Sequence, residues 1–301
     1  MNKTKSIIIV LVSIFSLILF GSSAFAQVGS SASEQNYPEA SSAGYHSMGL
    51  GTFEAGWLIG HRVYGPQQSG ERGQIEDLMI DRTNGRVVFV ILSDVQGFGA
   101  EYVAAPFSAL ERTGEDTFQL NFGDWDTSQW YWGRSIIALS TIPSRIDSLW
   151  ADSVYQFYGQ KPYWTEGRTV HPDIMSYRAA GPSILQSLFT EKMAPVLMGA
   201  MLHSKDGKEV ARTSDLVIDS KDGRVAFLVL DRITGRSDSE VAVPFDELSM
   251  SDHAFVLNTT GEKLAAAPRF NENADMGNRD YAARVYMFFG VQPYWTGEKT
   301  H

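Results

Sequence analysis

The chain has 301 residues, no cysteine and a formal net charge of −10 at pH 7. The absence of cysteine excludes disulfides, thiolate metal sites and thiol nucleophiles together. The Lys and Arg residues are scattered singly, and an acidic surface without a basic stripe repels phosphate backbones, so we expect no nucleic-acid partner.

The first 26 residues have the order of a secretory signal peptide. Lys3 and Lys5 form a positive start, an apolar run covers 7–20, and Ala24-Phe25-Ala26 supplies a cleavage site. This run is shorter than the roughly 18 residues that a membrane-spanning helix needs. The sequence therefore predicts cleavage after Ala26, a periplasmic or secreted mature protein and no stable membrane span. Retention of the segment as an uncleaved anchor is the alternative.

The first unit after this leader reads as β structure. Residues 78–81 and 87–92 are short apolar runs rich in Val, Ile and Phe, a composition that favours buried strands. Asn84-Gly85 between them predicts a tight hairpin with the glycine in the left-handed conformation. Pro106 has no amide hydrogen to give to a neighbouring strand, so we expect it at a strand end or on an edge.

A crowded group of aromatic residues follows in a polar segment, 124–134, of the first unit. Exposed Trp and Tyr side chains anchor protein interfaces and also stack on flat ligands such as sugars or quinones. We take these residues as the candidate interaction surface. The alternative is that they pack over an open end of the first barrel, and the sequence leaves both interpretations open. The residues are Trp125, Trp130, Tyr131 and Trp132.

Each unit ends in an amphipathic helix and a Pro-Tyr-Trp tail, at 162–164 and at 293–295. Gly159 and Gly290 stand where a glycine ends a helix, with a proline shortly beyond. We expect each tail to dock onto its own barrel. The apolar residues at helical spacing are Ile146, Leu149, Val154 and Phe157 in the first unit, and Tyr281, Val285 and Phe288 in the second.

An internal repeat organises the chain, since residues 77–92 recur as 215–230 with nine of sixteen positions identical. The same offset pairs 103–107 with 241–245. The offset is smaller at the helices, so the first unit carries extra residues, which we place in the Trp-rich segment. The predicted organisation is a signal peptide at 1–26, a flexible Ser/Ala/Gly-rich tether at 27–51, a first unit at 52–164, a linker with at most one brief helix at 165–192, and a second unit at 193–301.

The repeated residues resemble the PRC-barrel family, known from the reaction-centre H subunit of photosynthesis and from a ribosome-maturation factor. The resemblance rests on Leu58-Ile59-Gly60, on the Asp-Leu-x-Ile-Asp hairpin with its Gly-Arg-Val, on Val-x-x-Pro-Phe, and on the proline step Ala267-Pro268. In the first unit that step is either missing or replaced by Ile142-Pro143. The resemblance implies a mainly β fold with two small PRC-type barrels, each followed by a short amphipathic helix. It also implies assembly and interaction roles without shared catalytic residues.

The repeated acidic residues are candidates for binding a cation. A pair of aspartates on each unit could hold a cation, but calcium takes about six to eight oxygen ligands and no acidic ladder supplies them. An aspartate just before a turn commonly accepts hydrogen bonds from local amides. We favour this capping interpretation for all four aspartates, which are Asp77 and Asp81 in the first unit and Asp215 and Asp219 in the second.

Arg86 and Arg224 recur directly after the hairpin glycines and could bind a carboxylate or a phosphate. The more ordinary interpretation pairs each arginine with a nearby aspartate, Asp81 or Asp219, at the mouth of its own barrel. The histidines are not at metal-ligand spacing and the known hydrolase and phosphate-loop motifs are missing, so we expect neither a cofactor nor a metal. These histidines are His46, His61, His171, His203, His253 and His301.

These patterns favour a binding or scaffold protein over an enzyme, because no set of nucleophile, base and orienting group can be assembled. The leading hypothesis is an exported protein that binds another envelope protein through the aromatic residues around Trp130. The alternative is a carrier that holds a small ligand in a groove between a barrel and its helix.

Overall fold

The hairpin at the centre of each module follows from the repeat. In this computed structural model β3 (Glu71–Asp81) pairs with β4 (Arg86–Ser93), and β12 (Glu209–Asp219) pairs with β13 (Val225–Asp231). Gly85 and Gly223 in the turns have φ angles of 69° and 73°, which confirms the predicted left-handed glycines. The structure describes residues 51–65, 71–95, 100–114, 116–121, 135–165, 172–178, 197–236, 239–250, 254–275 and 277–296.

The two modules share one strand order. It runs β6-β7-β2-β3-β4-β5-β8 in the first and β15-β16-β11-β12-β13-β14-β17 in the second. The further strands of the first module are β2 (Arg62–Tyr64), β5 (Tyr102–Pro106), β6 (Leu110–Arg112), β7 (Phe118–Leu120), β8 (Ala138–Leu139) and β9 (Arg145–Ile146). Those of the second are β11 (Met201–Ser204), β14 (Glu240–Pro244), β15 (Leu248–Met250), β16 (Phe255–Leu257) and β17 (Arg269–Phe270). The strands β2 and β7 pair in parallel, as do β11 and β16.

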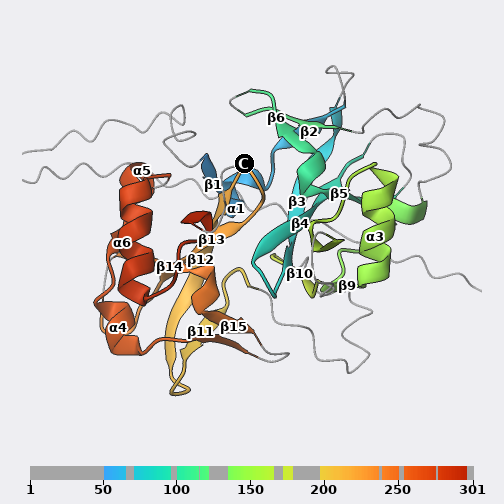
Figure 1. Cartoon of the computed structure of the whole chain (residues 1–301). Coiled ribbons are helices and arrows are strands. Elements are labelled where there is room, and N and C mark those ends of the chain that lie inside the picture. The colour runs from blue at the N-terminus through green and yellow to red at the C-terminus, as the bar shows by residue number, and fades with distance from the viewer. Residues whose placement is uncertain are drawn as a thin grey trace, which may run out of the picture. The chain divides into compact units, whose positions relative to one another are not determined.

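One helix packs on each sheet, as predicted (Figure 1). Helix α3 (Ser148–Phe157) contacts β5, and α6 (Arg279–Phe289) contacts β14. Asp147 and Asn278 cap their N-termini through hydrogen bonds to backbone amides, and Gly290 ends α6 with a φ of 79°. The shorter helical segments are α1 (Ala55–Leu58), α4 (Gly261–Ala265) and α5 (Glu272–Asp275), with one-turn 3₁₀ helices η2 (Phe107–Ala109), η3 (Tyr163–Thr165), η5 (Phe245–Glu247) and η6 (Tyr294–Thr296).

A tyrosine on each helix locks it to a bulge in the sheet. The register shifts in the β3–β4 and β12–β13 ladders leave Val88 and Ala226 unpaired. Their carbonyl oxygens accept hydrogen bonds from the hydroxyls of Tyr155, at 3.1 Å, and Tyr286, at 3.0 Å. The sequence analysis placed Leu149 on the apolar face of this helix, and that prediction is wrong. The side chain of Leu149 is 69% exposed, and Tyr155 lies on the buried face instead.

The strand that precedes each module pairs with the other module. Strand β1 (Thr52–Glu54) leads into the first module but pairs with β12, with Thr52 opposite Asp219. Strand β10 (Ile174–Ser176) leads into the second module but pairs with β3, with Ile174 opposite Asp81. We call β1 and β10 the exchanged strands. Both modules are therefore completed by chain from outside their own repeat.

The linker between the modules and the exit of the first module differ from their predictions. The predicted linker 165–192 contains β10, so part of it is a strand. The exit of the first module is β8, which pairs with β5 as β17 pairs with β14. Residues 138–139 therefore stand in the place of Arg269-Phe270, so the proline step is missing from the first unit and Ile142-Pro143 does not replace it. Among the described residues, no helix is both long enough and apolar enough to cross a membrane.

The chain is mainly β and consists of two barrel-like modules, each with its helix, as the sequence predicted. The core of each module is the inner face of its sheet under the helix. Val87 to Leu92 of β4 are buried without a break, because one face meets α3 and the other the barrel interior.

Candidate functional site

The two hairpin turns meet each other, and their contacts are reciprocal. The amide of Val87 donates to the carbonyl of Gly223 at 2.8 Å, and the amide of Val225 donates to the carbonyl of Gly85 at 2.7 Å. Arg86 and Arg224 face each other as an antiparallel bridge between these two bonds. We call residues 81–87 and 219–225 the seam. It joins the modules like an interface between two identical copies.

Glycine is required at the seam for a second reason besides its φ angle. A β-carbon added to Gly85 would lie 2.4 Å from the ring of Phe245. One added to Gly223 would lie 2.7 Å from the ring of Phe107. Each phenylalanine is the one that follows the repeated proline, so each module presses an aromatic ring against the turn of the other.

The aspartates at the strand ends cap their turns, as predicted, and also hold the tails. Asp81 accepts from the amide of Thr83 and Asp219 from that of Lys221, both at 2.9 Å. Asp81 also accepts from the hydroxyl of Tyr163, at 2.6 Å. The hydroxyl of Tyr294 donates to Asp219 at 2.7 Å. Each Pro-Tyr-Trp tail therefore docks onto its own barrel.

Burial keeps these tyrosine hydroxyls protonated. Desolvation, together with the neighbouring carboxylate of Asp81, raises the pKa of Tyr163 well above its usual range. The same causes, with Asp219 as the carboxylate, raise the pKa of Tyr294. Both hydroxyls are therefore hydrogen-bond donors at physiological pH.

The prediction that each arginine pairs with an aspartate of its own barrel is wrong for Arg86. Its Nη2 lies 3.1 Å from Oδ2 of Asp222, in the turn of the other module. Nε of Arg224 lies 3.5 Å from the same oxygen. Each guanidinium also lies over a tail ring, with Arg86 above Tyr163 and Arg224 above Tyr294, both at 4.9 Å from the ring centre.

The other two aspartates secure the exchanged strands. Asp77 is fully buried and accepts hydrogen bonds from the hydroxyl of Ser176 and from the amide of Arg178, the latter at 2.9 Å. Asp215 accepts from the amide of Gly56 at 2.9 Å and from the hydroxyl of Tyr177 at 3.0 Å. Burial raises the pKa of both carboxyl groups. The capping interpretation thus extends to long-range contacts that join the modules.

Glu54 on β1 has an unusual environment. Burial raises its pKa from 4.5 to about 8, and the nearby carboxyl groups of Asp215, Glu272 and Glu240 add to the effect. At neutral pH the side chain of Glu54 is mostly protonated. The matching position on the other exchanged strand is Ser176, which has no charge to bury.

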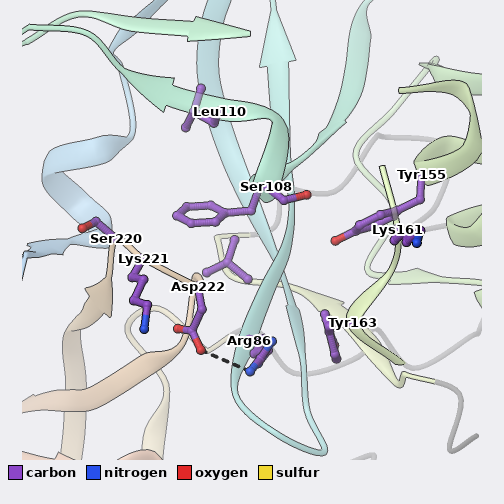
Figure 2. A pocket seen from close by; sticks show the side chains of 11 residues that line it. Arg86, Ser108, Leu110, Tyr155, Lys161, Tyr163, Ser220, Lys221 and Asp222 are labelled. Atoms are coloured by element: carbon purple, nitrogen blue, oxygen red, sulfur yellow. Dashed lines mark ion pairs between the residues drawn. The ribbon is translucent and has the colours of Figure 1, made fainter. Parts of the chain in front are cut away.

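A pocket of about 280 Å³ opens where the seam meets the first barrel and its tail (Figure 2). Figure 2 shows Lys221 and Asp222 on one side of Arg86 and Lys161 on the other. The lining residues come from β4, η2, β6, α3 with its tail, and the second turn, and they are Arg86, Val87, Phe107, Ser108, Leu110, Tyr155, Lys161, Tyr163, Ser220, Lys221 and Asp222.

The four candidate aromatic residues, Trp125, Trp130, Tyr131 and Trp132, lie outside the described residues, so their role stays a prediction. The longer connection of the first module does fall in that region, between β7 and β8. Within the described ranges, no group of three or more His, Asp and Glu side chains could hold a metal ion. His61 lies 3.8 Å from Asp116, and His203 lies 3.9 Å from Glu209.

Sequence reasoning missed the pocket residues Lys161, Ser108 and Lys221. One signal was available, because the repeat aligns Lys161 with Gln292 and Lys221 with Thr83. A cation present in one copy only marks a difference between the modules. That these residues surround one cavity depends on the seam, which the sequence did not reveal.

The comparison with known families agrees with the two modules. The model of the PRC-barrel domain matches residues 51–124 and 197–264. These two matches begin before β2 and β11 and include the central hairpins. A search of curated proteins finds no match for this chain.

Proposed function

This chain belongs to the PRC-barrel family, with two domains in tandem, and on that premise we propose that it is an exported, non-catalytic binding protein of the cell envelope. PRC-barrel domains are generally protein-interaction modules without catalytic activity. The proposed partner is another envelope protein, and the proposed location is the periplasm or the exterior of the cell. The leader at residues 1–26 supports export.

One observation carries this proposal. The polar residues that recur in both modules are engaged in holding the protein together: Asp77 and Asp215 secure the exchanged strands, and Arg86 and Arg224 meet at the seam. Residues used in this way are poorly placed to turn over a substrate. The unrepeated Trp-rich segment of the first module is then the feature that distinguishes this chain, and Trp-rich surfaces serve as binding hot spots.

The test is to replace Trp130 and Trp132 together by alanine in the full-length exported protein, and to identify envelope proteins cross-linked to it in cells. We expect the specifically recovered partner to fall at least about tenfold, as for loss of a hot spot. Leu149→Ala is the matched control, because Leu149 is exposed on α3 of the same module. Recovery of the same partners by the double variant would contradict the proposal.

Export has its own measurement. Removal of residues 2–26 is expected to leave the protein in the cytoplasm, whereas the full chain is recovered from the periplasm or the medium with Gln27 as its first residue. Mass spectrometry of the mature N-terminus distinguishes cleavage from retention as an anchor. Recovery of the intact leader on the exported protein would contradict cleavage.

A second candidate function, carriage of a small ligand, is favoured by the pocket between the first barrel and its helix tail. Tyr155 and Tyr163 line this groove on the helix side, and Phe107 lines it on the barrel side. Concave sites with apolar walls and a few polar groups are typical of ligand pockets. A thermal-shift screen of envelope metabolites tests this function, and it fails if no compound stabilises the protein.

A further inference from the structure

The two turns of the seam differ at one carboxylate beside the arginines. Two guanidinium groups, of Arg86 and Arg224, share the single carboxylate of Asp222. The residue in the equivalent place of the first turn is Asn84, whose Oδ1 accepts from the amide of Arg86 as Asp222 accepts from that of Arg224, each at 3.0 Å. The turn geometry is thus the same in both modules, but one of the two carboxylates is missing.

The same side of the seam gathers further cations. Among the described residues that line the pocket, Arg86, Lys161 and Lys221 are cationic and Asp222 is the acid. The equivalents of the lysines across the seam are Gln292 and Thr83, so this charge belongs to one side only. In a chain of net charge −10, a local excess of positive charge in a concave site attracts anions.

Arg86 is also held in a fixed orientation. Its guanidinium is stacked on Tyr163 and paired with Asp222, so its planar fork is set in place before any ligand arrives. Figure 2 shows Lys221 and Lys161 on opposite sides of this group. A guanidinium held in this way, with two ammonium groups in the same lining, suits an oxyanion, which accepts hydrogen bonds from several donors.

The walls determine the rest of the ligand. Phe107, Tyr155 and Tyr163 present rings, and Val87 and Leu110 present aliphatic groups to the same cavity. A volume of about 280 Å³ is near the lower limit for ligand pockets, which excludes large molecules. The occupant must therefore be small and have an apolar body with one charged end.

We propose that this pocket binds a small organic oxyanion, a compound with an apolar or aromatic body and a single carboxylate or phosphate group. The proposal deepens the second candidate function, ligand carriage, and rests on it. The oxyanion supplies the negative charge that Asn84 does not, between Arg86, Lys161 and Lys221.

The experiment measures binding of three probes with one ring to the purified mature chain by calorimetry and thermal shift. Benzoate and phenyl phosphate carry the two proposed anionic groups, and benzylamine carries the opposite charge. We expect at least one of the anions to bind saturably with a Kd below about 10 mM, and its affinity to fall as salt is added. We expect no stabilisation by benzylamine. Binding by one anion alone identifies which oxyanion the pocket prefers.

The decisive variant exchanges the pocket lysines for their equivalents in the other half, Lys161→Gln with Lys221→Thr. Both side chains are exposed, so the fold is expected to survive. The affinity for the anion should fall at least about tenfold. The control, Lys205→Gln with Lys208→Gln, removes the same charge from the exposed β11–β12 turn and should bind as the wild type does.

Three results overturn the proposal. One is anion binding that the double variant retains in full. Another is equal stabilisation by benzylamine and benzoate, which leaves ligand carriage standing but removes the charge argument. The third is no saturable binding of either anion, and if the metabolite screen also finds no stabilising compound, ligand carriage fails as well. The cross-linking result for Trp130 and Trp132 is independent of all three.

Discussion

The two modules have the same framework and differ at its edges. Both contain the bulged hairpin, the tyrosine that reaches the bulge carbonyl, the tail tyrosine on the strand-end aspartate, and the arginine over that tyrosine ring. They differ at Glu54 against Ser176, Asn84 against Asp222, and Lys161 against Gln292. The Trp-rich segment occurs in the first module only.

The residues that the two modules share are the ones that make matching contacts between them. The residues present in both halves make the reciprocal contacts of the seam and secure the exchanged strands, so a change in either copy would weaken the joint. The residues that differ lie around the pocket, on the exchanged strands and in the Trp-rich segment, and two of them, Asp222 and Ser176, add contacts to the joint from one side only.

The largest expected effect comes from filling the space at the seam. Gly85→Ala or Gly223→Ala places a methyl group against a phenylalanine ring of the other module, at a positive φ. We expect each to lower the free energy of unfolding by roughly 2–4 kcal/mol, measured by urea denaturation. The control Gly207→Ala also has a positive φ but open space around it, and should cost about 1 kcal/mol. A seam glycine that costs no more than Gly207 would contradict the close contact.

The next effect compares the two tails. Tyr163→Phe and Tyr294→Phe each remove a hydrogen bond to a buried carboxylate and should cost roughly 1–3 kcal/mol in urea denaturation. Asp81 retains the amides of Thr83 and Asp173, at 2.9 and 3.2 Å, whereas the described residues give Asp219 the amide of Lys221. We therefore expect Tyr294→Phe to lower the free energy of unfolding more than Tyr163→Phe does. The reverse order would show that the tails are held by their rings rather than by their hydroxyls.

The third effect depends on pH and on one exchanged strand. Because the pKa of Glu54 is raised from 4.5 to about 8, the folded protein binds this proton more tightly than the unfolded chain does. Its contribution is fully present below pH 4.5 and is lost as the pH rises toward and through 8. The variant Glu54→Ser copies the other exchanged strand and should be more stable than the wild type by roughly 1–2 kcal/mol at pH 8, after solvent screening is allowed for.

This gain should shrink as the pH falls toward 4.5, in thermal unfolding followed across the range. Glu111→Gln, at an exposed glutamate on β6 of the first module, is the control and should show no such dependence. A gain that is the same at pH 5 and pH 8 would mean that the charge on Glu54 is not the cause.

The smallest effect restores the symmetry of the seam. Asn84→Asp supplies the second carboxylate beside Arg86, at an exposed position, and should stabilise the protein by at most about 0.5–1 kcal/mol in low salt. The gain should disappear at high ionic strength. The same change should weaken binding of benzoate, because the new carboxylate neutralises the positive charge of Arg86 that attracts the ligand. Unchanged affinity for benzoate would mean that the charge at position 84 does not influence binding in the pocket.

Most of the framework could be predicted from the sequence because its signals are local. Asn84-Gly85 and Asp222-Gly223 specify a hairpin through the backbone freedom of glycine, and the runs on either side specify strands by composition. The helices before the Pro-Tyr-Trp tails and the glycine after each helix are signals within a few residues of one another. The repeat then required that whatever one copy forms, the other forms too.

The joint between the copies was decided by the tertiary structure alone. Nothing near Arg86 in the sequence indicates that its partner is Asp222 rather than Asp81, because the contact spans two turns that meet only after both barrels have folded. Thr52 opposite Asp219 and Ile174 opposite Asp81 have the same origin, since strands pair by open backbone edges, which carry little sequence information. The sequence determined two modules, and the packing of their turns decided that they share a seam and a pocket.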